Sequence, residues 1–147
     1  MTLRDAGTEL VALQTALAAE HAAIYGYAVV GAHLTGSELA DATASYQDHR
    51  RRRDELTAMI RELGADPEPA AAAYKLPFRV ESPADARRLA GRLEDGVAQA
   101  HAALVAASTR RPVRERGASA LSDAAVAIAR WTHTTSAFPG LSTPSAN

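Results

Sequence analysis

Two long stretches of this chain place their inward residues in alternating steps of three and four, the spacing of a helix that packs along one face. In the first stretch these positions are Leu10, Leu13, Leu17, Glu20, Ile24, Tyr27, Gly31 and Leu34. In the second stretch they are Leu39, Ala42, Tyr46, His49, Arg53, Leu56, Ile60 and Leu63. Polar groups interrupt both stripes at mid-length, so the spacing predicts two long helices that carry Glu20 and His49 on their inward faces.

The composition favours helix and excludes several classes of site. Roughly a quarter of the residues are Ala, the residue with the highest helix propensity, and few are aromatic. At 147 residues the chain fits one domain that buries its own core. A net charge of -1 gives no broad basic surface for nucleic acid or an anionic membrane. The absence of cysteine excludes disulfides and thiolate metal sites.

The sequence contains no evident targeting signal and no clear motif for binding a partner. Its N-terminal segment lacks an apolar signal core, and no later segment is apolar enough to span a bilayer. We therefore expect a cytoplasmic location and no membrane partner. A run of four arginines, residues 50–53, weakly suggests phosphate or nucleic-acid binding, but such runs are most often solvated helix faces. We expect no nucleic-acid partner.

Capping residues divide the chain into four helices. The predicted spans are 3–34, 37–64, 83–108 and 112–134. Thr2 is a candidate N-cap for the first helix, and Asp5 completes a capping box. Gly64 suits the end of the second helix because glycine tolerates the left-handed conformation. Ser82 and Pro83 form the N-cap and the first position of the third helix.

A Pro-rich segment, residues 65–81, separates the second helix from the third. At about 3.3 Å per extended residue it reaches roughly 55 Å, which exceeds the length of a helix of about 40 Å. Tyr74, Leu76 and Phe78 provide apolar anchors for docking. The alternative is a disordered linker between two helical hairpins. A long crossover at this point is the ferritin arrangement, which up-down-up-down bundles do not need.

These spans predict an all-α, ferritin-like four-helix bundle over residues 1–136, with a long crossover between helices two and three. Residues 137–147 are predicted to form a C-terminal tail, because Phe138-Pro139-Gly140 breaks the chain after the fourth helix. The bundle is a single domain, since each helix needs the others to cover its apolar face.

The ligand set for a metal centre is incomplete. A ferritin-like di-metal site takes a Glu from each of two helices and a Glu-x-x-His from each of the other two. This chain offers Glu20, His49 and Glu94 near the middle of the first three helices, but Tyr46 stands where the first Glu-x-x-His needs its Glu. The fourth helix has neither Glu nor His at mid-depth. Two irons need more carboxylates than this, whereas one Fe, Mn or Zn ion with three protein ligands is an alternative.

Arginine supplies another way to balance the inward carboxylates. Arg53 follows His49 by one turn, and an inward guanidinium would neutralise Glu20 or Glu94 without a metal. Arg130 on the fourth helix is a second candidate for that role. In the single-metal alternative, Arg53 must turn away. We predict no cofactor and a buried polar cluster of Glu20, Tyr46, His49, Arg53 and Glu94.

Two further groups flank these positions. His101 follows Glu94 by two turns on the same face, and we interpret it as a core histidine with a hydrogen bond rather than as a second metal ligand. Asp123 flanks the inward face of the fourth helix and is a candidate partner for an arginine.

The chain resembles the alanine-rich, ferritin-like domains of unknown function found in actinobacteria. The segments that carry this resemblance are residues 13–27, 49–54, 74–77, 93–94, 129–131 and 138–140. The resemblance implies a four-helix ferritin-like fold but supplies no activity. The wider ferritin-like superfamily implies iron storage or di-iron redox chemistry, and this chain departs from that pattern at Tyr46 and on its fourth helix.

We interpret the protein as a non-enzymatic binding or structural module whose di-iron site is degenerate, with a small-molecule ligand that the sequence does not identify. The alternative is an oxidoreductase-like enzyme with one metal at Glu20, His49 and Glu94. We also expect a homodimer, because Tyr25 and Val29 lie outside the first inward stripe and leave apolar surface to cover.

Overall fold

The computed structural model describes residues 1–134 and residue 141, and these residues form helices without any strand. In chain order the helices are α1 (Leu3–Ala32), α2 (Gly36–Glu62), α3 (Pro83–Ala107) and α4 (Arg111–Thr132). The predicted all-α class is confirmed, and the helix ends lie close to the predicted ones. The predicted tail over residues 137–147 lies outside the described residues, apart from residue 141, and the boundary near 136 stays a prediction.

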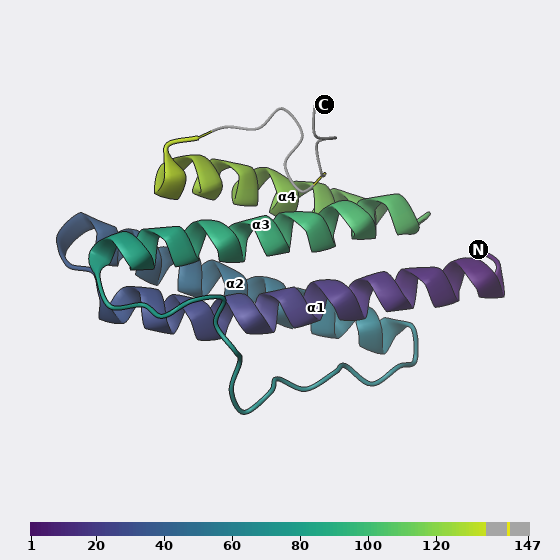
Figure 1. Cartoon of the computed structure of the whole chain (residues 1–147). Helices are drawn as coiled ribbons and strands as arrows, with labels where there is room; N and C mark the ends of the chain where they lie inside the picture. The colour runs from purple at the N-terminus through teal and green to yellow at the C-terminus, as the bar shows by residue number, and fades with distance from the viewer. Residues whose placement is uncertain (135–140, 142–147) are drawn as a thin grey trace, which may run out of the picture.

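The helices lie side by side along one axis (Figure 1). α3 packs against both α1 and α4, and α1 packs against α2. The segment between α2 and α3 returns along the length of the bundle before α3 begins (Figure 1). α2 and α3 therefore run in the same direction, which is the connection predicted for a ferritin-like bundle. Among the described helices, α2 and α4 contact each other far less than these packed pairs do.

Local hydrogen bonds start and end the helices where the sequence predicts. The Thr2 backbone N–H donates to the Asp5 carboxylate over 3.0 Å, and the Asp5 backbone N–H donates to the Thr2 hydroxyl over 3.1 Å. The Ser82 hydroxyl accepts a bond of 3.1 Å from the backbone N–H of Asp85. Gly64, just after α2, has a φ of 74°, which glycine adopts without steric cost. The predicted capping residues are confirmed.

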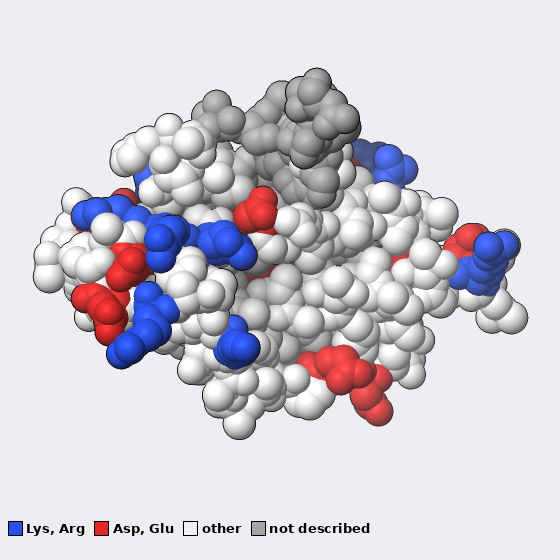
Figure 2. Space-filling model, in the orientation of Figure 1, with Lys and Arg blue, Asp and Glu red and all other residues white. Residues whose placement is uncertain are grey.

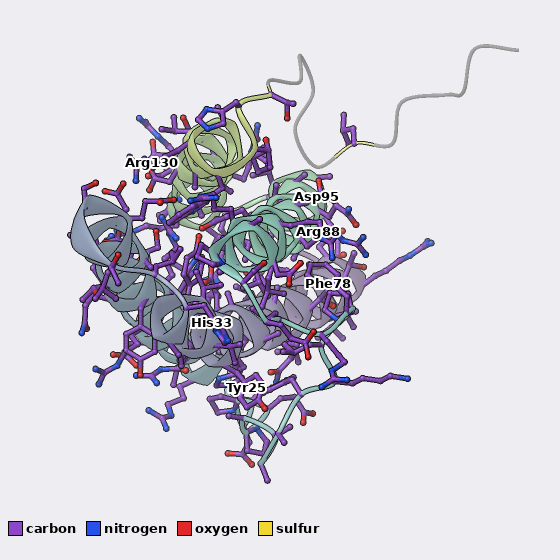
Figure 3. All side chains as sticks on the ribbon, turned by 60° about the vertical axis from the view of Figure 1, so that its left-hand side comes forward. Tyr25, His33, Phe78, Arg88, Asp95 and Arg130 are labelled. Atoms are coloured by element: carbon purple, nitrogen blue, oxygen red, sulfur yellow. The ribbon has the colours of Figure 1, made fainter. Side chains whose placement is uncertain are left out.

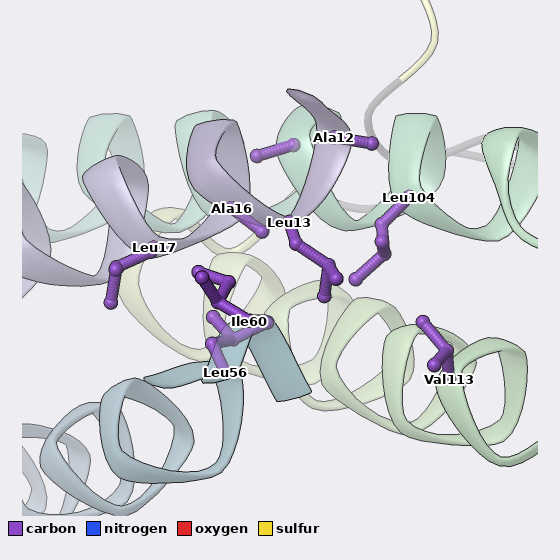
Figure 4. Close-up of a cluster of buried hydrophobic side chains, with 9 residues drawn as sticks. Ala12, Leu13, Ala16, Leu17, Leu56, Ile60, Leu104 and Val113 are labelled. Atoms are coloured by element: carbon purple, nitrogen blue, oxygen red, sulfur yellow. The ribbon is translucent and has the colours of Figure 1, made fainter. Parts of the chain in front are cut away.

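The apolar core falls into clusters along the bundle axis. One cluster joins residues of all four helices near the N-terminal half of α1 (Figure 4). Its members are Ala12, Leu13, Ala16, Leu17, Leu56, Ile60, Ala100, Leu104 and Val113. A second cluster surrounds Tyr27 and Trp131 toward the other end. Each fully buried Leu or Ile contributes about 1.5–3 kcal/mol, so the two clusters hold the helices on either side of the middle of the bundle.

The buried face of α2 differs from the predicted face on either side of His49. Ser45 and Arg52 are buried, whereas Tyr46 and Arg53 are only partly buried. Successive helical residues turn by about 100°, which places Ser45 and Arg52 on one side of His49. Tyr46 and Arg53 lie on the other side. Steps of three and four fit both sides equally well, so only the neighbouring helices decide which side is covered. The prediction that Arg53 lies in the buried face is wrong, and Tyr46 lies at its edge.

Small residues allow close approach between the helices. A Cβ atom on Gly26 of α1 would collide with the side chain of Leu93 on α3. A Cβ atom on Gly117 of α4 would lie 2.9 Å from Val105 Cγ2 on α3. At these two positions α3 lies so close to α1 and α4 that only a glycine fits. This close packing explains part of the Gly content of the chain.

The crossover, residues 65–81, is docked on α1. Gln14 binds its backbone twice: the side-chain amide donates to the Asp66 carbonyl over 2.8 Å, and its oxygen accepts from the Glu68 N–H over 2.9 Å. The His21 ring also lies 3.1 Å from the Glu68 carbonyl oxygen. These contacts contradict the alternative of a disordered linker between two hairpins.

Aromatic contacts extend this docking. The rings of Tyr25 and Tyr74 have centroids 5.5 Å apart, and the Arg88 guanidinium lies 3.9 Å from the centre of the Phe78 ring (Figure 3). Val29 packs on the second core cluster. Tyr25 and Val29 are thus partly covered within the chain, which leaves less apolar surface for a homodimer to bury. The homodimer stays a prediction, which sedimentation at micromolar concentration tests.

The surface is mixed in charge. On the face shown in Figure 2, basic and acidic groups lie close together toward each end of the molecule, and a broad neutral area separates the two ends. No helix in the described part of the chain is long and apolar enough to cross a membrane.

Replacing Gln14 by Ala removes both side-chain bonds to the crossover while leaving the buried core intact. We expect faster proteolysis within residues 65–81 and a loss of about 1–2 kcal/mol in the free energy of unfolding. Limited proteolysis and urea denaturation measure the two effects.

Gln99→Ala is the matched control, because Gln99 is exposed and bonds only to Asp95 on its own helix. Equal cleavage rates for the two variants would show that Gln14 does not hold the crossover.

Candidate functional site

A chain of hydrogen bonds crosses the buried middle of the bundle. His101 Nε2 lies 2.7 Å from Glu20 Oε1, and Glu20 Oε2 lies 2.6 Å from His49 Nδ1. The other ring nitrogen of His49, Nε2, lies 3.1 Å from Glu94 Oε1. None of the four side chains is more than 3% exposed. We call Glu20, His49, Glu94 and His101 the polar network.

Three helices position these side chains. α1 presents Glu20 between the two main core clusters, and α2 presents His49 at the same depth. α3 supplies both Glu94 and His101, which are two turns apart and therefore share one face. Burying a charge is costly unless it is paired and hydrogen-bonded. Each member of the network meets that condition through another member.

The network holds an imidazolium between two carboxylates. An ionised carboxylate only accepts hydrogen bonds, so both ring nitrogens of His49 must donate and both must carry a proton. Burial opposes this charge, but the hydrogen bonds to Glu20 and Glu94 raise the pKa of His49 to about 9. Burial also opposes ionisation of Glu20, but hydrogen bonds from His101 and His49 lower its pKa to about 2. At neutral pH, His49 is therefore positively charged and Glu20 negatively charged.

His101 is bonded at one nitrogen only. Its Nε2 faces Glu20, whereas Nδ1 is fully enclosed and has no hydrogen-bond partner among the described residues. A neutral ring with its proton on Nε2 donates to Glu20 and leaves only a lone pair at Nδ1. The structure places His101 in the core, as expected, and gives it a partner that the sequence did not identify.

Tyr27 and Trp131 extend the network to α4. The Tyr27 hydroxyl donates to Glu94 Oε1 over 2.5 Å, and the Trp131 indole N–H donates to the Tyr27 oxygen over 3.0 Å. Burial and the Glu94 carboxylate raise the pKa of Tyr27, so its hydroxyl stays protonated. Sequence reasoning placed both residues on inward faces but missed this role. The available signal was that Tyr27 follows Glu20 by two turns, with a polar end that a core position must satisfy.

Arg52, not Arg53, is the arginine beside the network. Arg52 is 8% exposed, and its guanidinium lies 3.5 Å from His49 Nδ1 and 2.8 Å from the Asp123 carboxylate. Arg53 instead has a side chain 30% exposed, which pairs with Asp54 over 2.8 Å. The predicted pairing of Asp123 with an arginine is confirmed. Tyr46, expected in the cluster, packs at the edge of the second core cluster instead.

The arginine run does not form a uniform basic face. Arg51 pairs with Asp48 over 2.7 Å, and Arg52 and Arg53 pair with other aspartates. The Arg50 guanidinium lies 5.8 Å from the centre of the Tyr46 ring. The acidic partners break up the positive charge that binding to a nucleic-acid backbone would require.

A cleft between α2 and α4 opens toward the network through two pockets. The larger, about 200 Å³ in volume, is lined by Glu94, His49 and residues of α2 and α4 including Arg130; we call it the Glu94 pocket. The smaller, about 50 Å³, is lined by His101 among others. Arg52 and Asp123 line both pockets, so their ion pair stands between them.

The arrangement of donors does not fit a metal ion. A metal needs the lone pair of a neutral imidazole, and both nitrogens of His49 are committed to carboxylates. Both oxygens of Glu20 are likewise engaged, by His49 and His101. Among the described residues, no group of three or more His, Asp or Glu is arranged to hold a metal ion.

A second buried carboxylate lies outside this site. Glu9 is fully buried in α1; it accepts from the Ser108 hydroxyl over 2.5 Å and from the Arg110 guanidinium over 2.6 Å. These bonds tie the turn between α3 and α4 to α1. Sequence reasoning missed Glu9, which lies one residue before the predicted inward position Leu10.

The protonation of His49 gives a testable dependence on pH. A folded pKa of about 9, against 6.5 unfolded, stabilises the fold fully below pH 6.5, and that contribution is lost as pH rises through 9. The native chain should therefore lose at most about 3 kcal/mol of unfolding free energy between these values. Urea denaturation at a series of pH values measures the slope.

His49→Gln should be less stable at pH 6.5 and should lack this decline. His21→Gln, at a more exposed histidine outside the network, should keep the slope of the native chain. A native slope that survives in His49→Gln would show that another group causes it.

Tyr27→Phe removes the hydroxyl that joins Glu94 to Trp131. We expect a loss of about 1–3 kcal/mol in unfolding free energy, because a buried carboxylate and a buried indole each lose a partner. Trp131 is the one tryptophan in the chain, so its fluorescence reports the same change directly.

Tyr25→Phe is the control for that experiment, since Tyr25 contacts the crossover and not the network. An emission maximum and a stability unchanged in Tyr27→Phe would contradict the hydrogen-bonded link.

Comparisons with known proteins agree with this fold. A conserved hypothetical protein from Mycobacterium tuberculosis has a similar structure over 86% of this chain and 96% of its own, with a TM-score of 0.84 and 38% sequence identity. A bacterioferritin from Desulfovibrio desulfuricans is similar over 88% of this chain and 77% of its own, with a TM-score of 0.66 and 12% identity, which shows the fold alone. These similarities confirm the predicted ferritin-like bundle.

A comparison with the curated proteins gave no match. A family model described as a domain of unknown function, DUF4439, matches residues 12–143. The predicted resemblance to ferritin-like domains of unknown function is confirmed at that level, and this chain belongs to the DUF4439 family.

Proposed function

We propose that this chain is a non-enzymatic binding module, in which the polar network takes the place of a di-iron centre. The observation that supports this most is the pair of carboxylates on the two ring nitrogens of His49. With both nitrogens protonated, the imidazole has no lone pair for a metal. Its positive charge balances the carboxylates of Glu20 and Glu94, as a metal cation would.

The composition of the site supports the same proposal. Two bridged irons need several anionic ligands, and the buried middle of the bundle offers only Glu20 and Glu94. On α4 the buried positions at this depth are Ala124 and Ala127, which carry no ligand atom. Asp123 is exposed and is already paired with Arg52.

The alternative is an oxidoreductase-like enzyme with one Fe, Mn or Zn ion at Glu20, His49 and Glu94. One observation removes an obstacle to it, because Arg53 is turned away from the network. However, a metal at this site would have to displace a proton from His49, because both of its ring nitrogens are bonded to carboxylates. The donor arrangement therefore favours the metal-free module.

The cleft between α2 and α4 supports binding over a purely structural role. It brings solvent-accessible volume of about 200 Å³ to the edge of the network, beside Glu94 and His49. A structural cluster has no need of such access, whereas small-molecule sites are concave and carry polar groups that orient the ligand.

Metal content tests the proposal. The chain is incubated anaerobically with Fe²⁺, Mn²⁺ or Zn²⁺, separated from free metal, and subjected to elemental analysis beside Glu20→Ala and His49→Ala. We expect no stoichiometric metal in the native chain. Both variants should lose about 3–5 kcal/mol of unfolding free energy, because each leaves a buried charge without its partner.

Glu68→Ala serves as the control, since its carboxylate lies outside the network on the crossover. One metal per chain, lost in both network variants and kept in the control, would overturn the proposal and make oxygen consumption the next assay.

A further inference from the structure

We propose that the Glu94 pocket binds a small zwitterion, with its ammonium group on Glu94 at the floor and its carboxylate on Arg130 at the mouth. The ligand class is a free amino acid with a short aliphatic side chain. This inference rests on the proposed function, because Glu94 must be free of metal to receive the ammonium group.

The floor of the pocket carries an unused acceptor. Both hydrogen bonds to Glu94, from Tyr27 and His49, end on Oε1. Its other oxygen, Oε2, has no partner among the described residues, although the side chain is only 3% exposed. Glu94 lines the pocket, so its carboxylate borders the open volume. A buried carboxylate oxygen that faces a cavity needs a donor.

The charge of the network calls for a positive donor. Two carboxylates, Glu20 and Glu94, share one imidazolium, which leaves a negative charge in excess. Arg52 approaches His49, but its charge is engaged by Asp123 over 2.8 Å. An ammonium group on Glu94 would balance the remaining charge and supply up to three hydrogen bonds.

The mouth of the pocket carries a cation. Arg130 lines the pocket, is exposed, and has no ion-pair partner among the described residues, whereas Arg52 in the same wall is paired. Figure 3 places Arg130 on α4, well away from Tyr25 and Phe78 at the crossover. A guanidinium binds a carboxylate through two parallel hydrogen bonds, so Arg130 suits the acidic end of the ligand.

The size and the remaining wall limit the ligand further. A volume of about 200 Å³ is below the roughly 300–1,000 Å³ of sites for drug-sized ligands, so it suits a ligand smaller than a nucleotide. Val126 and Ala127 form an apolar side of the pocket. A simple amine would leave Arg130 unused, and a simple carboxylate would meet the negative charge of Glu94.

Calorimetric titration of the chelator-treated chain provides the test. The probes are L-alanine and L-valine, together with isobutylamine and isovalerate, which are valine without its carboxylate and valine without its amine. We expect an amino acid to bind at one per chain, and each single-charge analogue of valine to bind at least about tenfold more weakly than valine.

Arg130→Gln separates the two ends of the ligand. It should weaken the binding of the amino acid at least about tenfold while leaving isobutylamine unchanged. Arg114→Gln, at an exposed arginine of the same helix outside this pocket, should bind as the native chain does. Neither substitution touches the buried network, so both variants should fold.

Three results would overturn the inference: no binding of either amino acid, equal binding of isobutylamine and valine, or no effect of Arg130→Gln. If one of these results is obtained with a chain shown to take up no metal, only the amino-acid site is contradicted, and the proposed metal-free module is not. Stoichiometric metal, measured separately, would overturn the proposed function itself.

Discussion

The placement of His49 between Glu20 and Glu94 is the constraint on which the middle of the bundle depends. Three charges are withdrawn from water there, and each is tolerable only while its partners remain in reach. Because these residues come from α1, α2 and α3, the bonds fix how the three helices align along the axis. The apolar clusters on either side then pack around a fixed register. Such a network adds little net stability compared with an apolar core, but it is costly to break, so it specifies one arrangement.

The fourth helix is held differently. Trp131 reaches the network through Tyr27, and α4 packs on α3. Its edge toward α2 is bridged by ion pairs, Arg52 with Asp123 and Arg116 with Glu55. At the α2–α4 edge of the described bundle, solvent approaches the buried groups through the pockets beside Glu94 and His101. A ligand can therefore approach Glu94 and His49 from this cleft.

The ferritin-like fold alone carries no assignment of activity. The bacterioferritin that shares the fold has a diiron site, but at 12% identity the likeness extends to helix arrangement and not to residues. In this chain the decisive features are local: a doubly bonded imidazole, an arginine beside it, and alanines on α4 at the same depth. Function has to be argued from those groups, and our proposal of an organic cation in place of a metal ion rests on them.

Local signals in the sequence determined the helices, their caps, the crossover and the inward positions of Glu20, His49 and Glu94. Helix period and capping depend on residues within a few positions of one another, so one sequence suffices to find them. The hydrogen-bond partners of those groups could not be predicted in this way. Whether Arg52 or Arg53 faces inward depends on which side of α2 its neighbours cover, and the bond from His101 joins residues 81 positions apart. Only tertiary packing brings such groups within hydrogen-bond distance, so only the structure decided what balances the buried charge.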